Sequence, residues 1–285
     1  MMHVVVSLIA VVFYLAAAIP QGLVLMGRGT LNPNLGSPGI TNARTVPHRT
    51  RLFLFGIIAV SAHGISALGT IYTPEGIDLG IFRVLSLISW FICAIALLNT
   101  LRRPLENSLA ILFPLACIAI AVSLVGHGPD VYLQNYGAGL LSHILLSILA
   151  YSVLALCALQ ALVLSLQERE LKHHHMRGVL RVLPPLQTME SMLFEGLWIG
   201  LILLTLAIAT GALYVDNLFA QHLVHKTAFS IIAWMIFAAL LWGHHQQGWR
   251  GHTAVRWTLV GFGALVLAYF GTKFVLELVL HRLPG

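Results

Sequence analysis

Eight long apolar runs limit what this chain can fold into more than any other feature. A helix that crosses a lipid bilayer needs about 20 consecutive apolar residues. Only 9% of the 285 residues are charged, whereas a soluble domain carries roughly 25%. We therefore predict an all-α, polytopic membrane helix bundle, organised as a single integral membrane domain over 1–285, with spans at residues 3–26, 52–72, 79–100, 107–125, 138–166, 192–215, 227–243 and 255–279.

The basic residues between the spans predict the orientation of the helices. Twelve of the 16 Lys and Arg fall in the four alternate loops that follow the first, third, fifth and seventh spans. Because Lys and Arg accumulate in cytoplasmic loops, both termini are expected on the outer, periplasmic side. The first run lacks the basic segment and cleavage site of a signal peptide, so we expect it to remain as the first span. The net charge of +6 therefore reflects topology, and no nucleic-acid partner is expected.

The three cysteines point to packing and not to a disulfide or a thiolate metal site. Cys93, Cys117 and Cys157 each lie inside an apolar run, and none has CxxC spacing. Such cysteines usually behave as small buried hydrophobic residues. The run His173 to His175 lies in a basic loop and is interpreted as a solvated surface segment.

The positions of several histidines suggest a site near the outer face. There are 14 His against 26 charged residues, and His143 opens the fifth span at its predicted outer end. His63 lies near the middle of the second span, where an ionisable group is costly unless it faces a partner, a cavity or a cofactor. The outer loops and the outer tail add His222, His225 and His281. The alternative for each is a solvated loop histidine or, for His63, a hydrogen-bonded side chain inside the bundle.

Haem is one cofactor that such histidines could hold, because neutral imidazole is a common axial ligand of haem iron. His143 and His63 are the candidate metal ligands under this interpretation, and His222 and His225, spaced i, i+3, would share one helix face. Lys226 and Arg83 are cations near the outer face that could neutralise propionates. Lys273 and Glu277 form a plausible i, i+4 pair.

Several short motifs follow one another in the second half of the chain. Ser142 and His143 open a span that carries Tyr151 two turns on, and the next span begins after Leu183, Pro184, Pro185, Leu186 and Gln187 and ends in Thr210, Gly211 and Ala212. Lys226 to Trp234, the turn Gly248, Trp249, Arg250 and Gly251, and Tyr269 to Gly271 complete the series. In this order and spacing the motifs resemble those of the cytochrome c assembly protein family, including its short YpjD-like members. The resemblance is greatest over residues 138–280.

The resemblance implies a bacterial inner membrane protein that holds haem b through histidines near the outer face. His143 matches one external ligand of the family, and His281 lies near the position of the second. One family feature is missing, because the stretch Asp216 to His225 contains no Trp, whereas the haem-presenting segment of the family's synthetases reads WGxxWxWD. Direct attachment of haem to an apocytochrome is therefore not expected of this chain.

These observations predict a haem-binding or haem-trafficking accessory membrane protein of the cytochrome c assembly type, without enzymatic activity of its own. Haem would lie between helices, ligated by His143 with His222, His225 or His281, and His63 could form a second, intramembrane station or a relay. Its expected partners are the lipid bilayer, haem, and another membrane protein or cytochrome assembly component. The alternative is a haem-free accessory or scaffold subunit that modulates a partner such as an ion transporter. A solute transporter is less favoured, because the sequence has no repeated half or intramembrane acidic cluster.

Overall fold

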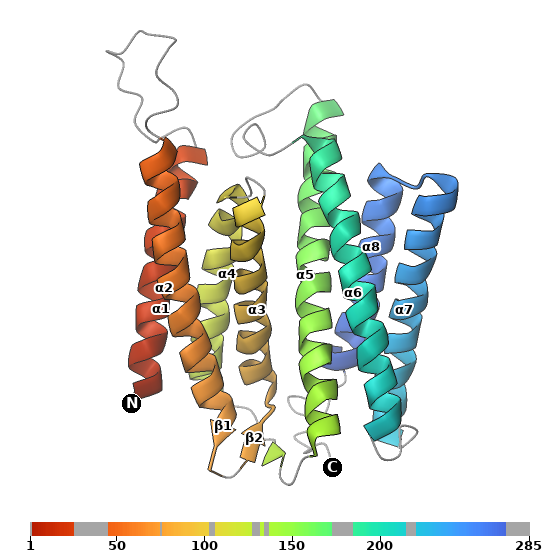
Figure 1. Ribbon diagram of the computed structural model, residues 1–285, viewed down its shortest axis with the longest axis horizontal. Coiled ribbons are helices and arrows are strands. Elements are labelled where there is room, and N and C mark those ends of the chain that lie inside the picture. Colours follow the sequence, from red (N-terminus) through yellow and green to blue (C-terminus); the bar gives the residue numbers. More distant parts are fainter. Residues whose placement is uncertain are drawn as a thin grey trace. The chain divides into compact units, whose positions relative to one another are not determined.

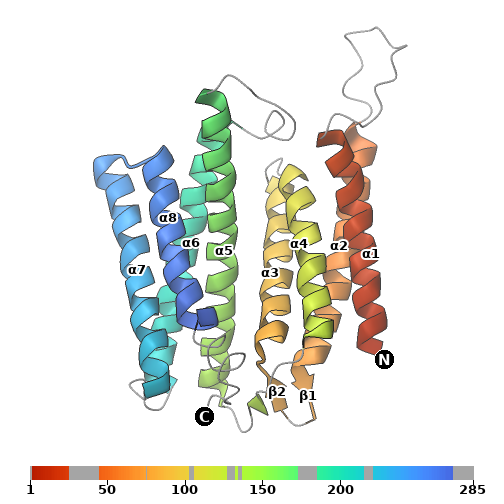
Figure 2. The same cartoon turned by 180° about the vertical axis from the view of Figure 1, so that it is seen from behind.

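The computed structural model describes residues 2–25, 45–74, 76–102, 106–126, 132–133, 137–172, 185–214 and 221–271. These residues form eight α-helices and three very short strands (Figures 1 and 2). The helices are α1 (Met2–Leu25), α2 (Thr45–Ile71), α3 (Ile81–Arg102), α4 (Glu106–Val125), α5 (Ala138–Lys172), α6 (Leu186–Tyr214), α7 (Gln221–Gln247) and α8 (Gly251–Val266). A π-helical turn, η2 (Leu267–Gly271), continues α8 directly.

The predicted all-α membrane bundle is confirmed. Seven of the described helices, α1 to α7, are long and apolar enough to cross a membrane. Helix α8 has 16 residues, and the last part of the predicted eighth span, after Gly271, lies outside the described residues. Large apolar side chains are exposed along the helices, among them Val12, Ile65, Leu98 and Ile118. This exposure is expected where lipid rather than water surrounds the protein.

The contacts within the chain divide it into two compact units. Unit 1 comprises Met1–Thr70, Leu85–Gly126 and His175–Pro184, and therefore contains α1, most of α2 and α3, and α4. Unit 2 comprises Ile71–Val84, His127–His174 and Pro185–Gly285, with helices α5 to α8. The single domain over 1–285 stays a prediction.

The core of unit 1 is built around aromatic and small side chains from several helices. Tyr14 of α1 and Phe113 of α4 are fully buried, and their ring centroids lie 4.8 Å apart. In α2, Gly64 leaves room for the indole ring of Trp90, which would lie 2.8 Å from a Cβ atom at that position. The Trp90 Nε1 atom donates a hydrogen bond to the carbonyl of Val60 at 2.9 Å. These close contacts require small residues in α2 where the indole crosses it.

The core of unit 2 is the antiparallel pair of α5 and α6, with α8 against α5 and α7 against both α6 and α8. The segments before α3 and before α5 form a three-stranded antiparallel sheet in the order β1 (Tyr72–Thr73), β2 (Gly76–Asp78) and β3 (Tyr132–Leu133). Two of the three cysteines, Cys93 and Cys157, are buried, and Cys117 is half-buried. All three are free thiols, as the sequence predicted.

Candidate functional site

His143 lies in the second turn of α5 and reaches across to α6. Its Nδ1 atom is 2.8 Å from the carbonyl oxygen of Ala207, near the C-terminal end of α6. A carbonyl oxygen can only accept a hydrogen bond, so Nδ1 must carry the proton. The neutral ring then has an unprotonated Nε2 atom, which makes no hydrogen bond among the described residues. His143 is half-buried.

Gly211 explains how the imidazole of His143 fits beside α6. A Cβ atom at Gly211 would lie 2.9 Å from Cε1 of His143 and 3.0 Å from its Nδ1 atom. Real Cβ atoms essentially never approach another heavy atom so closely, so a side chain at this position would displace the ring. The Thr-Gly-Ala motif that ends the sixth span therefore has a steric role. Its Thr210 hydroxyl donates to the carbonyls of Leu206 at 2.8 Å and Ala207 at 3.1 Å.

The bond between His143 and Ala207 gives the arrangement typical of a metal-binding histidine. Such a histidine usually donates its second ring N–H to a carbonyl or carboxylate, which fixes the tautomer and the ring orientation. The donor chemistry of His143 therefore fits one axial position of a haem iron. No group of three His, Cys, Asp or Glu gathers in the described part of the chain, and a haem iron needs only one or two protein ligands.

Two of the other predicted ligands lie at the same end of unit 2 as His143. Helix α7 begins at Gln221, so His222 and His225 fall in its first turns, and α6 ends nearby at Tyr214. Only the backbone of these two histidines is described. Lys226 follows on α7 and is half-buried. His281, Lys273 and Glu277 lie outside the described residues, so these predictions remain open.

His63 has a different environment in unit 1. Its side chain is fully buried, and both ring nitrogens lie close to hydroxyl groups. Nδ1 is 3.2 Å from the Tyr14 hydroxyl, and Nε2 is 3.1 Å from the Ser86 hydroxyl. Each hydroxyl can donate or accept, so either neutral tautomer of His63 can be satisfied. This geometry favours the hydrogen-bonded interpretation of His63, and its role as a ligand stays a prediction.

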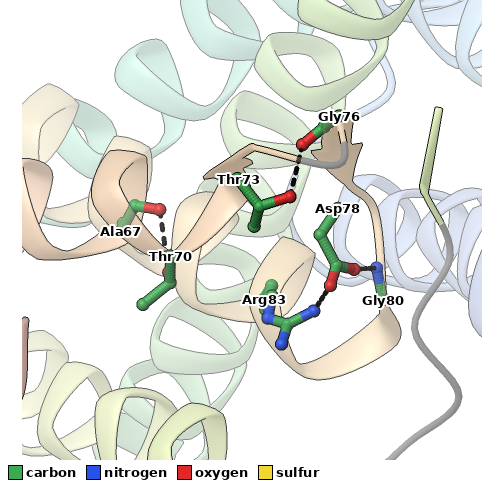
Figure 3. Close-up of polar contacts among 7 residues, drawn as sticks. All are labelled: Ala67, Thr70, Thr73, Gly76, Asp78, Gly80 and Arg83. Carbon is green, nitrogen blue, oxygen red and sulfur yellow. Dashed lines mark hydrogen bonds and ion pairs between the residues drawn. The ribbon is translucent and has the colours of Figure 1, made fainter. Parts of the chain in front are cut away.

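Arg83 is engaged by a carboxylate of its own unit. Figure 3 shows its guanidinium pointing toward Asp78, with which it forms an ion pair. Asp78 is fully buried, and its Oδ1 atom also accepts a hydrogen bond from the backbone N–H of Gly80 at 2.8 Å. The pair thus fixes the entry to α3 beside the hairpin of β1 and β2, where Thr73 donates to the carbonyl of Gly76. Because Asp78 balances its charge, this geometry favours a structural role for Arg83.

One histidine with the same bonding as His143 was not singled out from the sequence. His244, near the end of α7, places Nδ1 2.8 Å from the carbonyl oxygen of Trp249. Its ring stacks on Phe194, with a centroid distance of 3.4 Å. By the same reasoning as for His143, the neutral ring keeps an unprotonated Nε2. The sequence signal is the run Trp242 to His245 just before the Gly-Trp-Arg-Gly turn, although Trp at the end of a span is ordinarily an interfacial anchor.

The Gly-Trp-Arg-Gly turn itself is bonded to one acidic side chain and lies close to a second. Gly248 and Gly251 adopt φ angles of 67° and 53°, a region that only glycine enters without strain. The N–H of Gly251 donates to Oε1 of Glu190 in α6 at 2.9 Å, and a Cβ at Gly251 would lie 2.8 Å from Oε1 of Glu168 in α5. The motif therefore ties the connection between α7 and α8 to the α5 and α6 pair.

The two tyrosines of the motif series join α5 to the end of α8. The Tyr151 hydroxyl donates to the carbonyl of Leu265, and its ring meets that of Tyr269 edge-on with centroids 5.8 Å apart. His143, Gly211, the Gly-Trp-Arg-Gly turn and the two tyrosines of the motif series thus each make a contact between helices of unit 2.

Comparison with known proteins identifies relatives of the chain. A family model described as "Cytochrome C assembly protein" matches residues 52–280. The "Inner membrane protein YpjD" of Escherichia coli strain K12 is 35% identical over 236 residues, which cover 81% of this chain and 88% of the relative. An "Uncharacterized 28.8 kDa protein" of Azospirillum brasilense is 34% identical over 140 residues, covering 48% of this chain and 52% of its own length.

A more distant similarity links the chain to proteins named for cytochrome c biogenesis. The "Cytochrome c biogenesis protein CcsA" of Gloeobacter violaceus is 27% identical over 93 residues, which cover 32% of this chain and 28% of that protein. No solved structure matches the chain.

Proposed function

The chain belongs to the cytochrome c assembly protein family, and from this premise we propose that it is a haem-binding, non-catalytic accessory protein in cytochrome c biogenesis. The family match extends over residues 52–280, and the seven long apolar helices make the chain a multi-pass inner membrane protein. The proposed role in cytochrome c biogenesis is inferred from relatives that are named for that process. Haem binding is the finer part of the proposal and depends on the histidines.

The observation that carries the proposal is the hydrogen bond from His143 Nδ1 to the Ala207 carbonyl. It holds the imidazole in the tautomer that leaves Nε2 available to an iron atom, and Gly211 provides the space in which the ring lies. A surface histidine without a fixed partner would lose side-chain entropy when it bound an iron atom. The His143 ring is already fixed before binding, so it would lose less. His143 is thus preorganised as a ligand.

A second ligand would come from the same end of unit 2. His222 and His225 are the proposed partners on α7, with His281 as the alternative after α8, and Lys226 would balance the charge of a propionate. The charge distribution between the spans would place this end on the outer side. Bound haem would supply an iron centre with a visible absorption band, and the chain would hold and orient it.

The sequence before Lys226 favours an accessory role over direct attachment of haem to an apocytochrome. The stretch Asp216 to His225 contains no Trp, so it lacks the aromatic segment with which the family's synthetases present haem. The chain would therefore hold haem for another assembly component, without itself forming the bond to an apocytochrome.

The proposal is tested by purifying the full chain in mild detergent after expression with added haem precursor. We expect a Soret band, and we expect His143→Ala to lower the haem bound per protein at least about tenfold, as loss of a preorganised ligand implies. His252→Ala is the matched control, because His252 is an exposed histidine of α8 in the same unit. This control should leave the band unchanged.

Two results would contradict the proposal at different levels. If the wild-type chain shows no Soret band, haem binding is wrong and the haem-free accessory or scaffold protein becomes the better description. If the band is present but His143→Ala and His252→Ala leave it equally intense, haem binding stands and the assignment of His143 is wrong.

A further inference from the structure

A hollow opens between α1 and α2 of unit 1. Its volume is about 280 Å³, and it is lined by Ala16, Ala17, Pro20, Arg51, Leu52 and Phe55. All six residues belong to unit 1. Five of them are apolar, and the sixth is a cation, so the lining combines a hydrophobic wall with one positive charge.

The sequence explains why neighbouring side chains leave this space unfilled. Ala16 and Ala17 have no atoms beyond Cβ, so α1 presents little volume to α2 here. Pro20 lies inside α1 and has no N–H, so the carbonyl of Ala16 loses its usual helical donor four residues on. Ala16, which lines the hollow, therefore has a carbonyl without its usual helical partner.

Arg51 and its neighbour Arg49 differ in the partners of their guanidinium groups. Arg49 donates to the carbonyl of Thr100 at 3.0 Å and lies over the ring of Phe53, 5.7 Å from the centroid. Arg51 is exposed and makes no hydrogen bond or ion pair within the described residues. Its guanidinium is thus available to an anion from outside the chain.

Unit 1 as a whole has very few carboxylates with which its arginines could pair. It contains eight Arg and no Lys, but Glu106 is its one acidic residue. Unit 2 has eight Lys and Arg and nine carboxylates. All eight arginines of unit 1 lie in loops that fall on one side of the predicted topology, or in the helix ends next to them. Such clusters attract the anionic headgroups of a membrane surface.

The hollow lies near the ends of two apolar helices. The apolar part of α1 ends at Leu23, and that of α2 begins at Arg49, so we expect Arg51 at the membrane surface and Phe55 one turn deeper. We propose that the hollow binds an anionic phospholipid, with its phosphate at Arg51 and the start of one acyl chain against Ala16, Pro20 and Phe55. A zwitterionic lipid has the same chains but no net charge to match Arg51.

The proposal is tested by native mass spectrometry of the full chain in detergent. Phosphatidylglycerol and phosphatidylcholine with identical acyl chains are titrated in parallel. The wild-type chain should prefer phosphatidylglycerol, and Arg51→Gln should reduce that preference about fivefold, the effect of one basic residue near a membrane surface. Arg256→Gln, an exposed arginine of α8 in unit 2, removes the same charge elsewhere and should change the preference by less than about twofold.

A second variant tests the acyl-chain part of the site. Ala16→Leu adds volume from a half-buried position and should weaken the binding of both lipids, while far-UV circular dichroism checks that the helices remain. Equal binding of the two lipids by the wild type would overturn the proposal. So would equal losses in Arg51→Gln and Arg256→Gln, which would indicate unspecific attraction, or unchanged lipid binding in Ala16→Leu.

Discussion

His63 in unit 1 and His143 in unit 2 are both histidines of apolar helices, yet their partners differ in kind. His63 is fully buried and lies between the hydroxyls of Tyr14 and Ser86. His143 is half-buried and donates from Nδ1 to a backbone carbonyl. Hydroxyls satisfy both nitrogens of the first ring, whereas the carbonyl satisfies one nitrogen of the second and leaves the other available.

This difference shows that the position of a histidine in a span does not reveal its role. A buried imidazole with two hydroxyl partners stabilises the packing of the helices that carry those hydroxyls. An imidazole held by one carbonyl is oriented for a further bond. The difference between the two histidines can be tested by substituting each of them, or the residues that contact each ring. The free energy of unfolding and the haem content are then measured separately.

The largest effect on stability is expected from His63→Ala. The substitution removes the imidazole that bonds to the buried hydroxyls of Tyr14 and Ser86, and it opens a cavity among α1, α2 and α3. Together these changes should lower the free energy of unfolding by about 2–4 kcal/mol. The measurement is unfolding in mixed micelles with increasing dodecyl sulfate, followed by circular dichroism.

His63→Gln is the matched variant, because an amide has both a donor and an acceptor for the two hydroxyls. It should recover at least about half of the lost stability. The comparison would fail if His63→Ala unfolded like the wild type, or if His63→Ala removed the haem band while His143→Ala left it unchanged.

The spans were predictable from the sequence because lipid imposes a strict length and hydropathy on each helix. The predicted run at 52–72 corresponds to the apolar helical segment Arg49–Ile71, and that at 107–125 to the segment Ser108–Val125. The three short strands were not predicted, since two or three residues of strand carry no periodic signal. The predicted orientation of the termini stays a prediction.

The candidate site could be predicted only in part. The sequence placed His143 near a span end, but its partner Ala207 lies 64 residues away on another helix, and no local pattern encodes the rotation that brings them together. The same limit applies to His63, whose partners Tyr14 and Ser86 come from two other helices. The bond of His244 could not be predicted either, because its partner Trp249 lies in the turn beyond α7, where Trp usually serves as an anchor.

A smaller effect is expected from Gly211→Ala. The added methyl would lie 2.9 Å from the His143 ring, so the ring must shift and its bond to Ala207 must lengthen. Overpacking of this kind costs about 1–3 kcal/mol. The same variant should shift the Soret band if His143 is a ligand. Gly263→Ala is the control, because a Cβ there meets no atom within 4 Å and should leave both readouts unchanged.

The smallest effect is expected from Tyr14→Phe. The substitution keeps the ring and its 4.8 Å contact with Phe113, and it removes only the hydroxyl beside Nδ1 of His63. Because the Ser86 hydroxyl can still bond to Nε2, only one ring nitrogen loses its partner, and the free energy of unfolding should fall by about 0.5–1.5 kcal/mol.

Unfolding in mixed micelles measures this loss, and the double variant Tyr14→Phe with His63→Ala measures the coupling between the two residues. If the two losses add fully, Tyr14 and His63 are not coupled, and the hydroxyl-bonded description of His63 is wrong. A coupling comparable to the loss in Tyr14→Phe alone would show that His63 stabilises unit 1 through its hydroxyl partners.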